Sequence, residues 1–171
     1  MLEYTPTFSS DAAERIARRH FGRSGPASPL PSERDQNFLI DDEHLGPIVL
    51  KIANAAENRD VLEAQQKVLG ALAARGAPVP RVVCTSRGEP LVEVENESQL
   101  HLAWAVTRLD GVPLADVAHR STAVLEQVGR CVAALTRALE GVEHPALARD
   151  FLWDLRRGAA LVAERRSMIA D

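Results

Sequence analysis

The chain has 171 residues, of which 46% are hydrophobic and 26% are charged, and its net charge is -4. This composition is typical of a globular protein and argues against intrinsic disorder, and the negative charge gives no reason to expect nucleic acid or an anionic membrane as a partner. The N-terminus lacks a signal pattern, and no run approaches the roughly 20 apolar residues that a membrane span needs. We therefore expect a cytoplasmic protein. Cys84 and Cys131 lie far apart among apolar neighbours, so we expect them to be buried free thiols.

The first third of the chain predicts one short helix and a hairpin. Ser9 and Ser10 are capping residues ahead of an amphipathic stretch that ends at Gly22, which predicts a helix between them. Residues 22–31 are rich in Gly, Pro and Ser and predict a loop. Alternating apolar residues then predict a strand at 37–40, a turn at 41–44 and a second strand at 47–52.

The rest of the chain predicts a long helix, further strands and a helical end. Apolar residues at helical spacing follow Asn54 as far as Arg75, and Gly76 stands where a helix would stop. We expect strands at 81–85 and 100–107, a further short strand at 91–94, and helices from residue 121 and over about 150–169. The sequence therefore predicts an α+β fold: a small, mostly antiparallel sheet with one inserted long helix, followed by helices beyond a boundary near 110–113.

Lys51 is the most informative residue, because it interrupts the apolar strand run of residues 48–52. Only Lys51 and Lys67 are lysines among the 20 basic residues of the chain. A charged ammonium is costly to bury without a partner, and its compact shape suits a point contact with phosphate oxygens. Strand alternation places Val49 on the same face as Lys51.

The element order and two motifs carry a resemblance to a known family. The loop Leu30-Pro31-Ser32-Glu33-Arg34-Asp35-Gln36-Asn37-Phe38 and the strand Ile48-Val49-Leu50-Lys51 resemble the aminoglycoside phosphotransferase and choline kinase-like family, and more narrowly its hydroxylysine kinase-like members. The resemblance implies a protein-kinase-like N-lobe over residues 1–109, including the N-terminal helix. Residues 110–171 would then form the exit from the hinge and the first helices of an incomplete C-lobe.

The resemblance also implies a nucleotide site. Lys51 would hold the phosphates of ATP, paired with the carboxylate of Glu63 on the following helix. An alternative stays open, in which Lys51 reaches solvent and Glu63 is an ordinary exposed helix residue. The remaining candidates implied by the resemblance belong to three groups. Ser32, Gln36 and Asn37 in the loop would cover the phosphates, and Val49 would line the adenine pocket. The Thr107 carbonyl and the Leu109 amide in the hinge would bind the adenine edge.

The catalytic motifs of the family are missing from this sequence. The family carries its catalytic Asp in an H-G-D loop and its magnesium ligands in a later D-x-D-like motif, and neither occurs in residues 1–171. We therefore name no catalytic and no metal-binding residue, and expect the magnesium ligands and the pocket for a small-molecule acceptor to lie in the absent C-lobe. We expect this chain to be an ATP-binding lobe that is inactive alone, from a kinase acting on an amino alcohol, a hydroxylated amino acid or an aminoglycoside. The alternative is a non-catalytic kinase-like binding module, for example one fused to a pyridoxal-phosphate-dependent aminotransferase.

Overall fold

The structure, a computed structural model, describes residues 4–96, 99–148 and 154–168. Its helices and strands follow in chain order as α1 (Ser10–Phe21), β1 (Ala27–Leu30), β2 (Gln36–Ile40), β3 (Ile48–Ile52), α2 (Arg59–Ala74), β4 (Val82–Val83), β5 (Val92–Glu95), β6 (Leu100–Thr107), α3 (Thr122–Ala138) and α4 (Gly158–Arg165). Short 3-10 helices stand at Leu114–Asp116, Pro145–Leu147, Leu155–Arg157 and Arg166–Met168. The predicted α+β fold is therefore confirmed.

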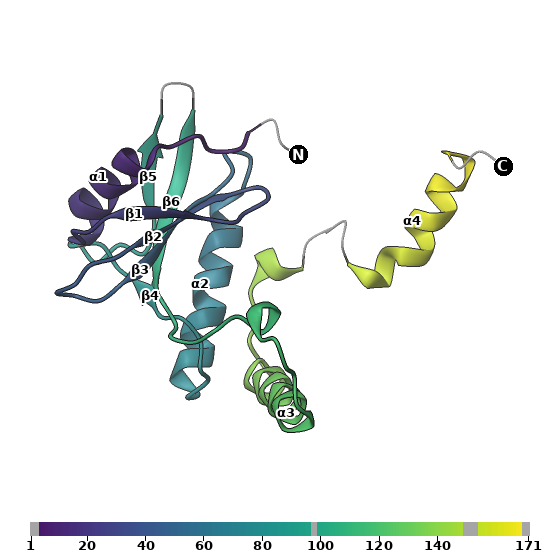
Figure 1. Cartoon of the computed structure of the whole chain (residues 1–171). Coiled ribbons are helices and arrows are strands. Elements are labelled where there is room, and N and C mark those ends of the chain that lie inside the picture. Colours follow the sequence, from purple (N-terminus) through teal and green to yellow (C-terminus); the bar gives the residue numbers. More distant parts are fainter. Residues whose placement is uncertain (1–3, 97–98, 149–153, 169–171) are drawn as a thin grey trace.

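The strands form one antiparallel sheet in the order β1-β2-β3-β6-β4 (Figure 1). The long strand β6 pairs with β3 on one side and with both β4 and β5 on the other. This arrangement places β3, the strand of Lys51, in the middle of the sheet.

Each face of the sheet is covered by one helix. On one face, Ile48, Leu50 and Ile52 of β3 form a core with Ala13 and Ala17 of α1. On the other face, Leu62 of α2 packs with Trp104 and Val106 of β6, and Val49 lies partly buried against them. Because successive strand residues point to opposite faces, Lys51 lies on the α2 face together with Val49, as predicted.

Helix α1 begins and ends where the sequence predicts, whereas α2 begins at Arg59, a turn later than the predicted start after Asn54. The Ser9 hydroxyl accepts a hydrogen bond from the Ala12 amide at 3.2 Å, and Gly22 ends α1 in the left-handed conformation with φ 63°. Asn58 caps α2 in the same way, through its side-chain oxygen and the Asp60 amide at 2.8 Å. These caps satisfy amide groups that the first helical turn leaves unpaired.

Two of the predictions made from the sequence were wrong. Residues 22–31 are not all loop, because Ala27–Leu30 forms β1 and pairs with β2. Pro29 lowers the strand signal, but β1 is an edge strand, where a residue without an amide proton costs no ladder bond. Cys84 and Cys131 are exposed and not buried. Their apolar neighbours misled the prediction, because Cys131 lies on α3, a helix without buried residues.

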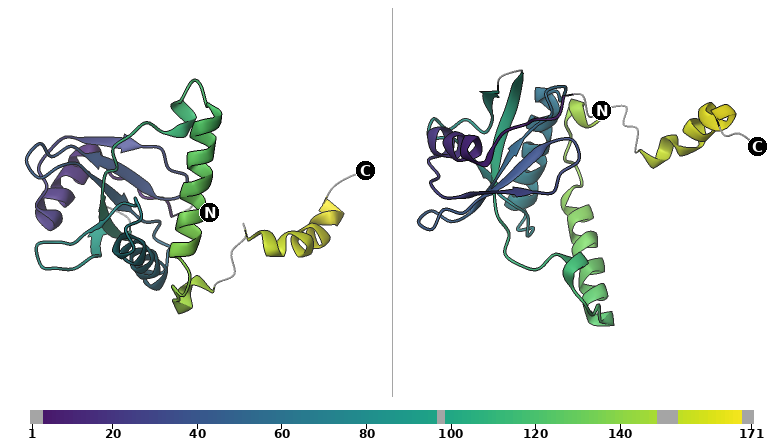
Figure 2. Two further views of the ribbon diagram at one scale, coloured as in Figure 1. Left: turned by 90° about the horizontal axis from the view of Figure 1, so that it is seen from below. Right: turned by 45° about the horizontal axis from the view of Figure 1, so that its top comes forward.

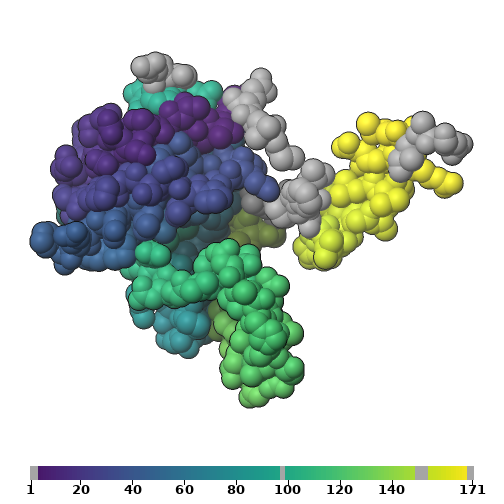
Figure 3. All heavy atoms as spheres, in the orientation of Figure 1, coloured from purple at the N-terminus to yellow at the C-terminus, as the bar shows by residue number. Residues whose placement is uncertain are grey.

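The last helices pack little against the sheet. Helix α3 runs along one side of the lobe beside α2, whereas α4 stands apart from it (Figures 1, 2 and 3). Lys67 of α2 donates to the Glu143 carbonyl at 3.1 Å, and Arg75 donates to the carbonyls of Ala138 and Glu140. Within the described segments, no helix is both long and apolar enough to cross a membrane.

A turn beside β1 leaves no room for a side chain at Gly25. A Cβ atom placed on Gly25 would overlap the backbone carbonyl group of Asp41. The carboxylate of Asp42 fixes this neighbouring turn by accepting hydrogen bonds from the amides of Ser24 at 2.7 Å and Leu45 at 2.9 Å. Backbone on both sides of Gly25 is therefore held in place and has little freedom to yield.

We expect Gly25→Ala to lower the free energy of unfolding by about 1–3 kcal/mol, the usual cost of an overpacked site. Gly70→Ala is the matched control, because Gly70 lies within α2 and a Cβ there would meet nothing within 4 Å. That change should stabilise the protein by about 0.5–1 kcal/mol, since alanine favours the helix. Urea denaturation of both variants measures the difference, and equal midpoints would contradict this account of the turn.

Candidate functional site

The side chain of Lys51 lies in a row of three that crosses the sheet. The register pairs Lys51 of β3 with Asn37 of β2 on one side and with Trp104 of β6 on the other. Directly opposed residues of antiparallel strands point to the same face and lie close enough to interact. The row therefore holds an amide, an ammonium and an indole side by side on the α2 face.

Both neighbours contact the ammonium group. The Nζ of Lys51 donates to Oδ1 of Asn37 at 3.2 Å and lies 5.6 Å from the centroid of the Trp104 ring. The first contact is a hydrogen bond and the second is a cation–π interaction, and neither neutralises the charge. In the part of the chain that the structure describes, Lys51 forms no ion pair with a carboxylate. The ammonium is thus partly buried, oriented and left with donors for an anion.

The predicted ion pair between Lys51 and Glu63 is not formed. Arg59 lies 4.0 Å from Glu63 and 3.0 Å from Glu93 of β5, measured between guanidinium nitrogens and carboxylate oxygens. Strand β5 lies beyond β6 from β3, so this contact turns Glu63 toward the opposite edge of the sheet. Glu63 also lines a hollow of about 680 Å³ between α2 and β4, together with Lys67. Glu63 therefore lies beside Arg59 and the hollow next to β4, and it does not pair with Lys51.

The loop between β1 and β2 is tied to the connection after β3. The Asn54 amide donates to Oδ1 of Asp35 at 3.0 Å, and the Asn54 side chain donates to the Arg34 carbonyl at 3.4 Å. Ser32 lies exposed in this loop. These bonds hold the loop that carries Ser32 beside the ends of β2 and β3, near the row that contains Lys51.

The loop residues predicted to cover phosphates divide between the two faces. Asn37 contacts Lys51, but Gln36 precedes it in β2 and therefore points to the opposite face. There the Gln36 side chain accepts from the Phe8 amide at 2.7 Å and donates to the Phe8 carbonyl at 2.8 Å. The prediction for the Gln36 side chain was wrong: its amide binds the N-terminal segment to the sheet.

The predicted hinge follows the end of β6. Thr107 is the last residue of β6, and its amide donates to the Arg81 carbonyl at 2.9 Å. Leu109 lies exposed just beyond the strand, while the Arg108 amide donates to the Pro47 carbonyl at 3.2 Å. Thr107 lies three residues after Trp104 along β6, which is roughly 10 Å along the strand. Val49 lies between the two positions, because it pairs with Val106.

Trp104 is the functional neighbour that sequence reasoning missed. The strand at 100–107 was predicted, but the sequence alone does not indicate that this strand pairs with β3 or that Trp104 lies opposite Lys51. A large aromatic residue within a predicted strand next to an orphan lysine was the available signal, since such rings bind cations on their faces.

The sequence of this chain is similar to those of known phosphotransferases. Residues 26–170 match the phosphotransferase enzyme family. The chain is 31% identical over 170 residues to a hydroxylysine kinase of Bos taurus and 32% identical over 164 residues to one of Danio rerio. These matches cover 88% and 90% of this chain but only 45% and 46% of the two relatives. The chain therefore spans less than half the length of the curated relatives it matches.

Solved structures show the same fold at low sequence identity. An amicoumacin kinase in complex with AMP-PNP and Ca²⁺ superposes with a TM-score of 0.70 at 14% identity, over 96% of this chain and 55% of that one. A microcompartment-associated aminopropanol kinase gives a TM-score of 0.65 at 20% identity, over 87% of this chain and 46% of that one.

Proposed function

Because the chain belongs to the phosphotransferase enzyme family, we propose that it forms the ATP-binding lobe of a kinase that phosphorylates a hydroxyl group of a small molecule. The names of its relatives, hydroxylysine kinase and aminopropanol kinase, support an amino alcohol or a hydroxylated amino acid as the acceptor, and an aminoglycoside belongs to the same chemical class. The acceptor pocket belongs to the second lobe of the complete enzyme.

One observation carries this proposal: Asn37 and Trp104 orient the ammonium of Lys51, and among the residues that the structure describes it has no carboxylate partner. Asn37 fixes Nζ through a hydrogen bond and Trp104 lies against it. Phosphate oxygens supply the missing negative charge, and a charge-assisted hydrogen bond to them is stronger than one between neutral groups. Lys51 would therefore hold the phosphates, and Asn37 would keep the lysine in position.

The neighbouring residues fit the rest of the nucleotide. Val49 offers an apolar surface on the same face, and the Thr107 carbonyl and Leu109 amide stand at the exit of β6, where they would bind the adenine edge. Ser32 would approach the phosphates from the loop between β1 and β2. When bound, ATP supplies the phosphoryl group for transfer. The described residues hold no cluster of three His, Cys, Asp or Glu side chains fit for a metal ion. The magnesium ligands would belong to the second lobe, as the motifs of the family imply.

The alternative function is a kinase-like module that binds a partner and has no catalytic second lobe. Helix α3 bears on both functions, because its apolar stripe is exposed: 53% of Leu125 and 57% of Val132 are accessible. A lobe that is stable by itself rarely leaves such a stripe uncovered. The stripe supports a lobe that packs against further polypeptide, which a catalytic second lobe or a bound partner would supply.

A thermal shift experiment tests the nucleotide proposal on this chain. Millimolar ATP should raise the unfolding midpoint, because a ligand that binds only the folded state stabilises it. Adenosine should raise it less, since it lacks the phosphates that Lys51 binds. In a coupled assay with ATP and hydroxylysine, the 171-residue chain should release no ADP above background. Equal shifts for ATP and adenosine would contradict the role of Lys51, and ADP release that depends on the acceptor would contradict the absence of transfer.

A further inference from the structure

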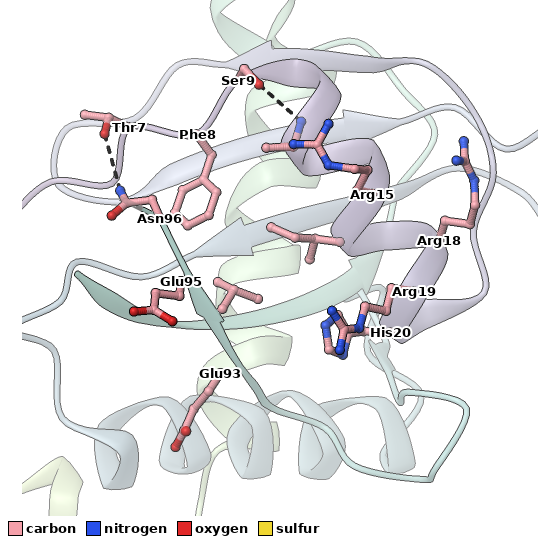
Figure 4. A pocket seen from close by; sticks show the side chains of 13 residues that line it. Thr7, Phe8, Ser9, Arg15, Arg18, Arg19, His20, Glu93, Glu95 and Asn96 are labelled. Carbon is pink, nitrogen blue, oxygen red and sulfur yellow. Dashed lines mark hydrogen bonds between the residues drawn. The ribbon is translucent and has the colours of Figure 1, made fainter. Parts of the chain in front are cut away.

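A groove lies between α1 and the edge strand β5, well away from the row that contains Lys51. Its volume is about 1090 Å³, and Arg15 and Arg19 of α1 and Glu93 and Glu95 of β5 are among its lining residues. Figure 4 shows the arginines along the helix on one side and the acidic side chains along the strand on the other. The nucleotide proposal uses none of these residues.

Within the described segments, the arginines of this groove have no anionic partner. Arg15, Arg18 and Arg19 are spaced three and four residues apart on α1, so they are neighbours on one helical surface. In the described residues none of the three forms an ion pair or a side-chain hydrogen bond. Neighbouring like charges repel, and this repulsion favours binding of an anion.

His20 adds no positive charge at neutral pH. Partial burial of the ring lowers the pKa of His20 below its usual value of 6.5, and the nearby charges of Arg19 and Arg87 lower it further. The positive charge in the groove at neutral pH therefore belongs to the arginines.

The outer edge of β5 offers free backbone groups. The Ala53 amide donates to the Leu102 carbonyl at 2.8 Å, so the backbone groups of Leu102 point toward β3. Glu93 is paired with Leu102 on the other side of β6. In an antiparallel ladder, the amide and carbonyl of Glu93 then point outward from the sheet, and those of Glu95 do the same. A further strand could form hydrogen bonds with this edge.

We propose that this groove binds an extended segment of a partner protein as an added strand beside β5, with acidic residues on the α1 face and basic residues on the other. Side chains of the added strand next to Val92 and Val94 share their face with α1 and meet Arg15 and Arg19. Those next to Glu93 and Glu95 meet carboxylates. Glu93 is already paired with Arg59 of α2 at 3.0 Å, so the Glu95 carboxylate is the one that selects a basic residue.

A second copy of this chain fits the edge poorly. Two β5 strands paired edge to edge would bring Glu93 and Glu95 of one copy beside the same residues of the other. Like charges on directly opposed residues destabilise a strand pair. Charge complementarity therefore favours a different polypeptide with alternating charges.

Fluorescence anisotropy with a labelled peptide tests the proposal on the full chain. The probe is an octapeptide of alternating glutamate and lysine, and its control has the same composition arranged as four glutamates followed by four lysines. The alternating peptide should bind more tightly at 50 mM NaCl, and binding should weaken at 500 mM NaCl because salt screens exposed charges. N-methylation of alternate peptide amides should abolish binding, since it removes the donors to the edge of β5.

Paired charge variants locate the site. Arg15→Gln with Arg19→Gln should weaken binding of the alternating peptide roughly fivefold or more, as expected for two exposed ion pairs. Arg165→Gln with Arg166→Gln removes the same charge from the distant end of α4 and should leave the affinity unchanged. Circular dichroism and the unfolding midpoint confirm that both variants are folded. The proposal is overturned if the block peptide binds as tightly as the alternating one, if neither binds at 1 mM, or if the two double variants behave alike.

Discussion

Trp104→Ala should lower the free energy of unfolding by about 3–5 kcal/mol, the usual cost of deleting a large buried aromatic side chain. Trp104 is only 3% exposed and packs with Leu62 of α2 and Val106 of β6. Its removal would open a cavity between the sheet and α2, in the middle of the longest strand. Guanidinium denaturation followed by circular dichroism measures the loss.

Trp104→Phe separates packing from the loss of the aromatic ring. Phenylalanine retains an aromatic face for Lys51 and part of the volume, so this variant should lose much less stability than Trp104→Ala. If the two variants have the same denaturation midpoint as the unaltered chain, Trp104 does not hold α2 on the sheet, and the packing described for this face is wrong.

Lys51→Ala should weaken binding of ATP by about 10- to 100-fold, because a hydrogen bond to a charged group contributes about 1.5–3 kcal/mol. The row of Asn37, Lys51 and Trp104 positions the ammonium, and no carboxylate of residues 4–96, 99–148 or 154–168 pairs with it. The affinity is measured by titration calorimetry at fixed salt concentration.

Lys67→Ala is the matched control for this change. Lys67 is the other lysine of the chain, lies exposed on α2 and donates to the Glu143 carbonyl. Its removal should leave the affinity for ATP unchanged and lower stability only slightly. If Lys51→Ala and Lys67→Ala bind ATP equally well, Lys51 is not the phosphate ligand.

Local signals in the sequence predicted most of the fold. Serine caps and Gly22 defined α1, and the alternation of residues 48–52 placed Lys51 and Val49 on the same face. These features depend on interactions between residues close in the chain, such as a cap hydrogen bond or the two-residue period of a strand. They are therefore readable without knowledge of the tertiary structure.

The errors concern contacts between distant parts of the chain. Gln36 and Asn37 are adjacent in sequence, yet strand alternation sends one to Phe8 and the other to Lys51. Assigning each of these two residues to the correct face would require knowing the start of β2 to within one residue. Glu63 has a suitable spacing from Lys51, but in the structure it lies beside Arg59 of the same helix, and Arg59 in turn pairs with Glu93 of β5. The first outcome depends on the exact start of β2, and the second on which strand lies beside α2.

Selective acetylation of the two lysines tests the central claim most directly. Lys51 and Lys67 are the only lysines in the chain, so brief treatment with an acetylating reagent followed by peptide mass spectrometry reports on both in one sample. With millimolar ATP present, the acetylation rate of Lys51 should fall while that of Lys67 stays the same, and adenosine should protect Lys51 far less. If ATP leaves the rate at Lys51 unchanged, or slows both lysines equally, the assignment of Lys51 to nucleotide phosphate is contradicted.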